Sequence, residues 1–85
     1  MYLHIGKGSV IPTESIVAIF DLDVTSQSHL TRSFLRRAEK NGQVVNAAED
    51  LPKSFIVSER EGRTTVYLSQ MAAATLLRRA ESGQI

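Results

Sequence analysis

Basic residues spaced four apart on one predicted helix are the strongest candidates for chemistry in this sequence. Arg32, Arg36 and Lys40 follow one another at that spacing, with Arg37 beside them. On a helix they form a positive ridge about 12 Å long, because each residue adds 1.5 Å of rise. Such a ridge can follow the phosphates of a nucleic acid. The alternative is a solvated face neutralised by Glu39, or a surface of salt bridges between subunits.

Two further cations stand at predicted turns. Lys7 lies between Gly6 and Gly8, and the extended segment that follows contains Pro12. A nucleotide phosphate loop would need a helix there, so a simple backbone turn that leaves Lys7 free to meet a phosphate fits better. Lys53 follows a proline and precedes a strand. We predict phosphate contacts, with little direct reading of bases, for four residues: Lys7, Arg32, Arg36 and Lys53.

The cations Arg60 and Arg63 are weaker candidates. They lie in a predicted hairpin loop among Glu59 and Glu61, whose carboxylates offset the positive charge. The sequence therefore does not favour this loop as a DNA contact.

Residues for catalysis or metal binding are missing from the pattern. The chain has no cysteine, and His4 and His29 have no partner at ligand spacing. Asp21 and Asp23 lack the further oxygen ligands that a cation site needs. No nucleophile stands with a base in an arrangement suited to catalysis. We therefore expect a protein that is not an enzyme and that uses no metal and no cofactor.

The elements that must position these cations alternate between strands and helices. Ser28 can cap a helix that ends near Asn41 and Gly42. Ser69 can cap a last helix, with Leu76 and Leu77 on its packing face and Met71 on the other side. This order predicts one α+β domain over residues 1–85, with a small, mainly antiparallel sheet and two helices. The predicted strands cover 2–5, 10–11, 15–22, 43–46, 53–58 and 64–68, and the helices 29–41 and 70–80.

The strand over 15–22 is apolar on both faces. Its alternation predicts Ile16, Ala18, Phe20 and Leu22 on one side, with Val17 and Ile19 on the other. A chain of 85 residues buries only about 60–65% of its unfolded surface, and one without cysteine cannot add disulfides. Self-association is the stabilising device that remains. We predict an oligomer interface at Val17, Ile19 and Met71.

Composition limits the setting in which the protein acts. Ten basic and nine acidic residues give a net charge of +1, too balanced to indicate a nucleic-acid binder by itself. The longest apolar runs fall far short of the 18–20 or so residues that span a bilayer, and the start has no secretory pattern. We expect a cytoplasmic protein with no membrane contact.

The order of several short segments resembles a small bacterial family, the extracellular matrix regulators RemA and RemB, and most of all its RemB branch. The resemblance spans nearly the whole chain, although no single motif is a catalytic signature. The matching segments are Tyr2–Gly6, Ile16–Ile19, Ser28–Arg32 leading into Phe34 and Leu35, Pro52–Val57, and Leu68 with Ser69.

This resemblance implies a cytoplasmic regulator of biofilm matrix genes. It also implies a DNA-binding fold of the LytTR kind and closed rings that engage duplex DNA through arginines. The sequence departs from RemA-like chains at two places. An arginine pair is replaced by Pro52-Lys53-Ser54, which keeps one cation, and an arginine before the second long strand is replaced by Glu14.

Two hypotheses follow. The first is a homo-oligomeric, ring-forming transcriptional regulator whose weak phosphate contacts add up through avidity. The second is an oligomeric interaction module that modulates a partner regulator without touching DNA. The near-neutral charge, Glu14 and the missing arginine pair favour the second.

Overall fold

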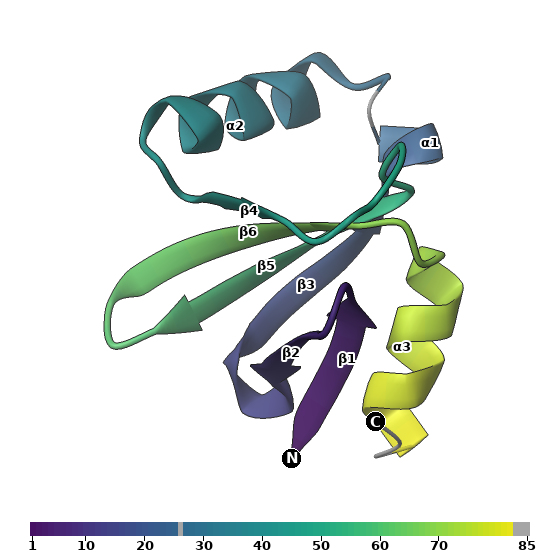
Figure 1. Cartoon of the computed structure of the whole chain (residues 1–85). Coiled ribbons are helices and arrows are strands. Elements are labelled where there is room, and N and C mark those ends of the chain that lie inside the picture. Colours follow the sequence, from purple (N-terminus) through teal and green to yellow (C-terminus); the bar gives the residue numbers. More distant parts are fainter. Residues whose placement is uncertain (26, 83–85) are drawn as a thin grey trace.

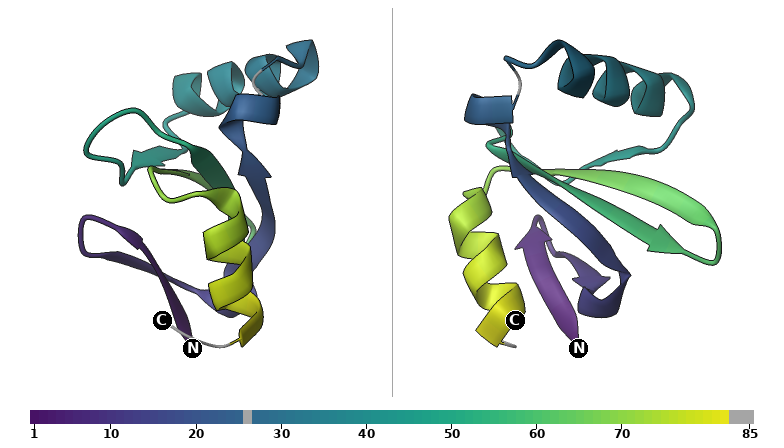
Figure 2. Two further views of the ribbon diagram at one scale, coloured as in Figure 1. Left: turned by 90° about the vertical axis from the view of Figure 1, so that its right-hand side faces the viewer. Right: turned by 180° about the vertical axis from the view of Figure 1, so that it is seen from behind.

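A four-stranded sheet forms the middle of three layers in the computed structural model, which describes residues 1–25 and 27–82. Helix α2 covers one face of this sheet, and the β1–β2 hairpin together with helix α3 covers the other (Figure 1). The two views in Figure 2 show the same three layers. The elements are β1 (Tyr2–Gly6), β2 (Ser9–Pro12), β3 (Ile16–Asp21), α1 (Leu22–Thr25), α2 (His29–Lys40), β4 (Val44–Asn46), β5 (Ser54–Arg60), β6 (Arg63–Ser69) and α3 (Ala73–Ser82).

Most strand pairs are antiparallel. The sheet has the order β3-β5-β6-β4, and β5 pairs antiparallel with both β3 and β6. Strand β4 instead runs parallel to β6, with Val44 opposite Val66. The hairpin of β1 and β2 is a separate two-stranded sheet. The predicted α+β class with a mainly antiparallel sheet is confirmed, and the second sheet and helix α1 are additions to it.

Strand β5 is buried on both sides because both faces of the sheet are covered. Phe55 packs toward α2, and Ile56 packs toward the hairpin and α3. The buried members on the α2 face are Ala38, Phe55 and Val66. Those on the α3 face are Leu3, Ile5, Ile11, Ala47, Ile56 and Leu76.

Helix α2 follows the capping signals in its sequence. The Ser28 hydroxyl accepts a hydrogen bond from the amide of Thr31 at 3.5 Å, and the Asn41 amide donates to the carbonyl of Arg37. Gly42, with φ of 70°, reverses the chain after the last turn. The predicted helix over 29–41 is confirmed to within one residue.

The last helix and the hairpin before it differ from prediction. Ser69 still belongs to β6, where its hydroxyl donates to the carbonyl of Ile5 at 2.7 Å and accepts from the amide of Met71 at 3.0 Å. Helix α3 therefore begins at Ala73 and not near residue 70. Leu77, expected on the packing face, is 50% exposed. Strands β5 and β6 also run further, which leaves only Glu61 and Gly62 as the turn.

A β-bulge in β3 overturns the predicted alternation at one point. The register with β5 shifts between Ile16 and Ala18, so two residues of β3 oppose one of its partner. Ile16 therefore packs with Ile19 on the α3 face, whereas Val17 lies beside Ala18 on the α2 face. The prediction grouped Ile16 with Ala18 and Val17 with Ile19, so both Ile16 and Val17 lie on the face opposite to the one expected.

Two short helical segments stand where strand or loop was expected. Residues 13–15 form a single 3-10 turn, so β3 starts at Ile16 and not at Ser15. The polar loop predicted over 23–27 contains part of α1. Ser26 in that loop lies outside the described residues.

Candidate nucleic-acid interface

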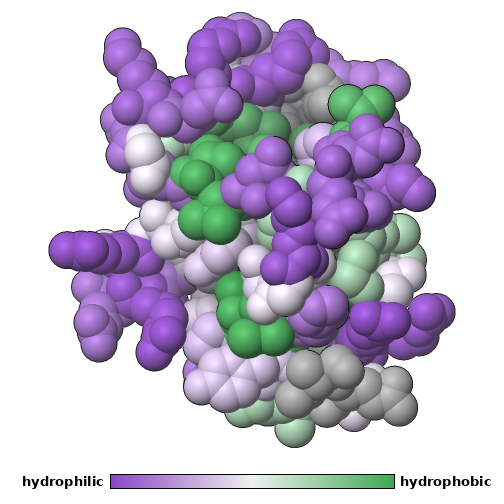
Figure 3. Space-filling model, in the orientation of Figure 1, coloured by the Kyte–Doolittle hydropathy of each residue, from purple (hydrophilic) through white to green (hydrophobic). Residues whose placement is uncertain are grey.

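The predicted row of cations lies on the outer surface of α2. Arg32, Arg36 and Lys40 are all exposed, on a helix whose other side packs on the sheet through Leu35 and Ala38. The four-residue spacing makes the row about 12 Å long. In Figure 3 the top of the molecule, where α2 lies, is covered by hydrophilic residues.

The structure brings Lys7 and Lys53 to one end of the sheet. The amide of Lys53 donates to the carbonyl of Ser69 at 2.8 Å, and the Ser69 hydroxyl donates to the carbonyl of Ile5. Lys7 stands two residues beyond Ile5, at the tip of the β1–β2 hairpin, with φ of 50°. Both lysine side chains are exposed.

The four predicted contacts therefore form two pairs and not one patch. Lys7 lies on the hairpin that covers the α3 face, whereas Arg32 and Arg36 lie on the helix that covers the opposite face (Figure 1). Lys53 stands between them at the end of the sheet. A single subunit therefore brings only some of the four predicted cations together at any one place.

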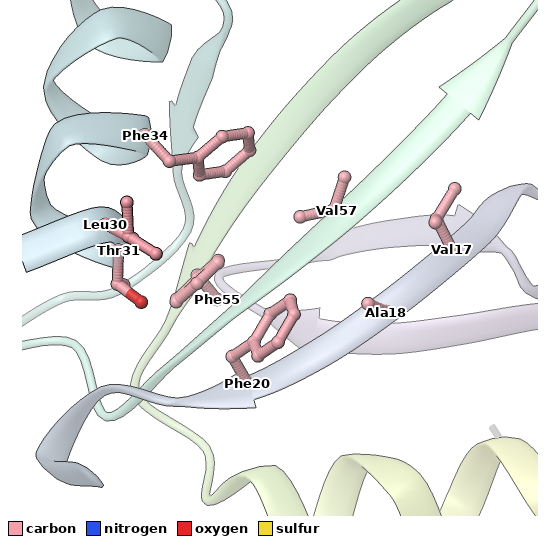
Figure 4. A pocket seen from close by; sticks show the side chains of 8 residues that line it. All are labelled: Val17, Ala18, Phe20, Leu30, Thr31, Phe34, Phe55 and Val57. Atoms are coloured by element: carbon pink, nitrogen blue, oxygen red, sulfur yellow. The ribbon is translucent and has the colours of Figure 1, made fainter. Parts of the chain in front are cut away.

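An open apolar groove separates the first half of α2 from strands β3 and β5 (Figure 4). Its volume is about 340 Å³. The rings of Phe20 and Phe55 stack at its floor with centroids 4.8 Å apart, and the ring of Phe34 lies above them, 6.4 Å from Phe55. We call this the apolar groove; its lining residues are Val17, Ala18, Phe20, Leu30, Thr31, Phe34, Phe55 and Val57.

The groove is open because α2 packs mainly through its second half. Leu35 and Ala38 reach the core on the α2 face, but Leu30 in the first turn is 78% exposed. On the strand side, Val17 is 65% exposed. Contiguous apolar surface of this kind, including a groove, is a common mark of an interaction site.

The three predicted interface residues differ in their surroundings. Val17 is exposed and lines the apolar groove. Ile19 and Met71 are partly buried against the core on the α3 face of the same subunit. Of the three, Val17 exposes the largest fraction of its surface, and Ile19 and Met71 expose less.

The described residues show no metal site and no membrane helix. No three histidine or acidic side chains among residues 1–25 and 27–82 lie close enough together to hold a metal ion. None of the helices in the same residues is long and apolar enough to cross a bilayer.

Sequence reasoning missed two features. The first is the apolar groove, which depends on which part of α2 packs on the sheet, and no local pattern reports this. The second feature is a cluster of basic and hydroxyl side chains on the β5–β6 hairpin around Arg60 and Arg63. Strand alternation continued to the turn would have placed these arginines on one face and Glu59 on the other.

Comparison with known proteins identifies relatives of the same size. Residues 2–80 match the model of the RemA-like family, described as extracellular matrix regulatory protein A-like. The chain is 32% identical over 81 residues to extracellular matrix regulatory protein B of Bacillus subtilis (strain 168), which covers 95% of this chain and 91% of that protein. The chain therefore belongs to the RemA-like family of extracellular matrix regulatory proteins, on its RemB branch.

Proposed function

We propose that this protein is a cytoplasmic transcriptional regulator of extracellular-matrix genes that works as a homo-oligomer on duplex DNA. The regulatory role is supported by the relative whose name describes it as an extracellular matrix regulatory protein. A LytTR-like mode of DNA binding and closure of the oligomer into a ring belong to the same proposal. Phosphate contacts come from Lys7, Lys53, Arg32 and Arg36.

The observation that carries the proposal is that α2 bears both features. Its outer face carries the cation row, and its inner face leaves the apolar groove open at Leu30 and Phe34. A second copy that fills the groove would hold the first half of α2 in place. It would thereby fix the position of the cation row on one subunit relative to the cation row on the neighbouring subunit.

A second copy is the occupant we favour because this chain also carries exposed apolar side chains outside the groove lining. Leu51 is 81% exposed, Val24 is 70% exposed, and both lie away from the groove lining. A contact between two different surfaces of identical subunits repeats head to tail, and it gives a ring when the rotation closes.

Repetition matters because each subunit alone binds weakly. Each phosphate neutralised lowers the slope of log K against log salt concentration by about 0.9. Two or three contacts give little affinity at cellular salt, whereas linked copies raise the effective concentration of every further contact.

The test combines light scattering with DNA binding. We expect multi-angle light scattering to give a mass of several subunits, and duplex DNA binding to weaken steeply as salt rises. The Arg32→Ala/Lys53→Ala variant should keep the oligomer and make the salt slope shallower by about 1.8 for each subunit that contacts the DNA. The control is Arg78→Ala/Arg79→Ala, which removes the same charge from α3 and should leave the slope unchanged. A monomer at micromolar concentration, or equal slopes for both variants, refutes the proposal.

A second candidate function is an oligomeric interaction module that modulates a partner regulator without binding DNA. The net charge of +1 and the division of the cations between two faces favour it. Under this alternative the chain still assembles, but duplex DNA produces no complex at any salt concentration. Any protein partner then shows only a shallow response to salt.

A further inference from the structure

The end of the β5–β6 hairpin projects beyond the layers that cover the rest of the sheet. Both Figure 1 and Figure 2 show the hairpin extending past the β1–β2 hairpin and α3. Figure 3 shows the same end as a hydrophilic projection. The turn has only Glu61 and Gly62, with φ of 53° and 80°, which is the geometry of a tight type I′ hairpin that holds its two strands in fixed register.

That register places arginine and hydroxyl side chains together on the α3 face. Arg60 pairs with Arg63, and Ser58 pairs with Thr65. Side chains of directly paired residues share a face, and Tyr67 lies on this face too because it packs with the core there. The carboxylate of Glu59, by the same alternation, belongs to the opposite face. The cavity beneath the hairpin is about 330 Å³, and its lining comprises Ser58, Arg60, Glu61, Arg63, Thr65 and Tyr67.

The two guanidinium groups form no ion pair within the part of the chain that the structure describes. No ion pair or hydrogen bond joins either side chain to another of the described residues. Glu61 lines the same cavity, yet its carboxylate pairs with neither arginine. Like charges directly opposite each other destabilise a strand pair. An anion bound between Arg60 and Arg63 would turn this repulsion into attraction.

We propose that the α3 face of the β5–β6 hairpin tip binds a phosphate group, with Arg60 and Arg63 as its charged donors. Arginine presents a planar fork of N–H donors that matches phosphate oxygens. The hydroxyls of Thr65 and Tyr67 can donate to the remaining oxygens. A phosphate, with more acceptor oxygens than a carboxylate, suits this set of donors better.

This site is separate from the contacts proposed above. Lys53 and Arg60 stand seven residues apart along an extended path, so about 23 Å lies between them. With DNA as the source of the phosphate, the inference rests on the proposed function and adds a second contact at the far end of the sheet. A free phosphorylated small molecule is the other source of the same chemistry.

The first arm of the test uses inorganic phosphate and the full-length chain. In a titration followed by amide NMR, at ionic strength held constant with chloride, we expect saturable shifts confined to residues 58–67. Arg60→Gln/Arg63→Gln should abolish these shifts. Tyr67→Phe, which keeps the packing of the ring, should weaken binding several-fold. The control Arg78→Gln/Arg79→Gln removes the same charge elsewhere and should bind phosphate as the wild type does.

The second arm uses duplex DNA and identifies the source. If DNA supplies the phosphate, Arg60→Gln/Arg63→Gln makes the slope of log K against log salt concentration shallower by about 1.8 for each subunit that contacts the DNA, and the α3 control does not. Phosphate-induced shifts with an unchanged DNA slope assign the site to a free phosphorylated molecule. If the wild type binds no DNA, the proposed function fails. The phosphate titration alone then decides whether the hairpin binds a phosphate group. No shift at residues 58–67 overturns the proposal.

Discussion

Replacing Gly6 by alanine should be among the most damaging single changes to this fold. Gly6 has φ of 128°, a conformation that side chains of L-residues rarely adopt. A Cβ added there would lie 2.9 Å from the backbone carbonyl oxygen of Ala47. Backbone strain of this kind costs about 1–3 kcal/mol. The contact adds to that cost, because the oxygen belongs to the main chain and cannot rotate away.

The matched control lies two residues further along the same turn. Gly8 also has positive φ, 74°, but a Cβ there would meet nothing within 4 Å. Gly8→Ala should therefore lower the free energy of unfolding only by the penalty for a left-handed alanine, about 1–2 kcal/mol. We expect Gly6→Ala to cost about 3 kcal/mol or more, which leaves a difference of at least about 1 kcal/mol attributable to the contact with Ala47.

Urea unfolding followed by circular dichroism measures both variants, at one protein concentration at which they have the same subunit number. For a domain of this size, 1 kcal/mol corresponds to about 4–8 °C in melting temperature, so thermal unfolding gives an independent reading. Equal losses for Gly6→Ala and Gly8→Ala would show that the close approach of the β1–β2 turn to Ala47 does not constrain the fold.

Three further predictions concern packing and turns. Ser69→Ala removes the hydroxyl that bonds both Ile5 and Met71, and should lower the free energy of unfolding by about 1–3 kcal/mol in urea titration, whereas an unchanged midpoint would contradict its role. Phe55→Ala should lower the free energy of unfolding by about 3–5 kcal/mol, because the ring is buried and stacked. A loss below about 1 kcal/mol would show that the groove floor collapses to fill the space. Glu61→Asn should raise the melting temperature by a few degrees because asparagine tolerates φ of 53° better, and a lower melting temperature would argue against that geometry.

The elements that local patterns specify were predicted well. Helix α2 has an N-cap at Ser28, a glycine after its last turn and an apolar stripe, so its ends follow from the sequence. Strand β5 is a short apolar run bounded by Pro52 and charged residues, and it is found where expected. Each of these signals acts over a few residues, which is why the sequence alone reports them.

The features that sequence reasoning missed depend on partners distant in the chain. The bulge at Val17 exists only as a register shift against β5, so a single strand gives no sign of it. Ser69 looks like a helix cap, but it ends strand β6, where its hydroxyl donates to the carbonyl of Ile5, 64 positions earlier. The apolar groove exists because α2 packs on the sheet through Leu35 and Ala38 and leaves Leu30 exposed.

The bond between Ser69 and Ile5 also bears on how the chain reaches its folded state. Strand β1 is made long before α3 and the end of β6, yet it packs against the first and is bonded to the second. During synthesis Leu3 and Ile5 of the β1–β2 hairpin therefore stay uncovered until β6 and α3 have left the ribosome. Contacts of such long sequence separation slow folding. A nascent chain stalled before residue 69 would present this unburied strand to chaperones and proteases.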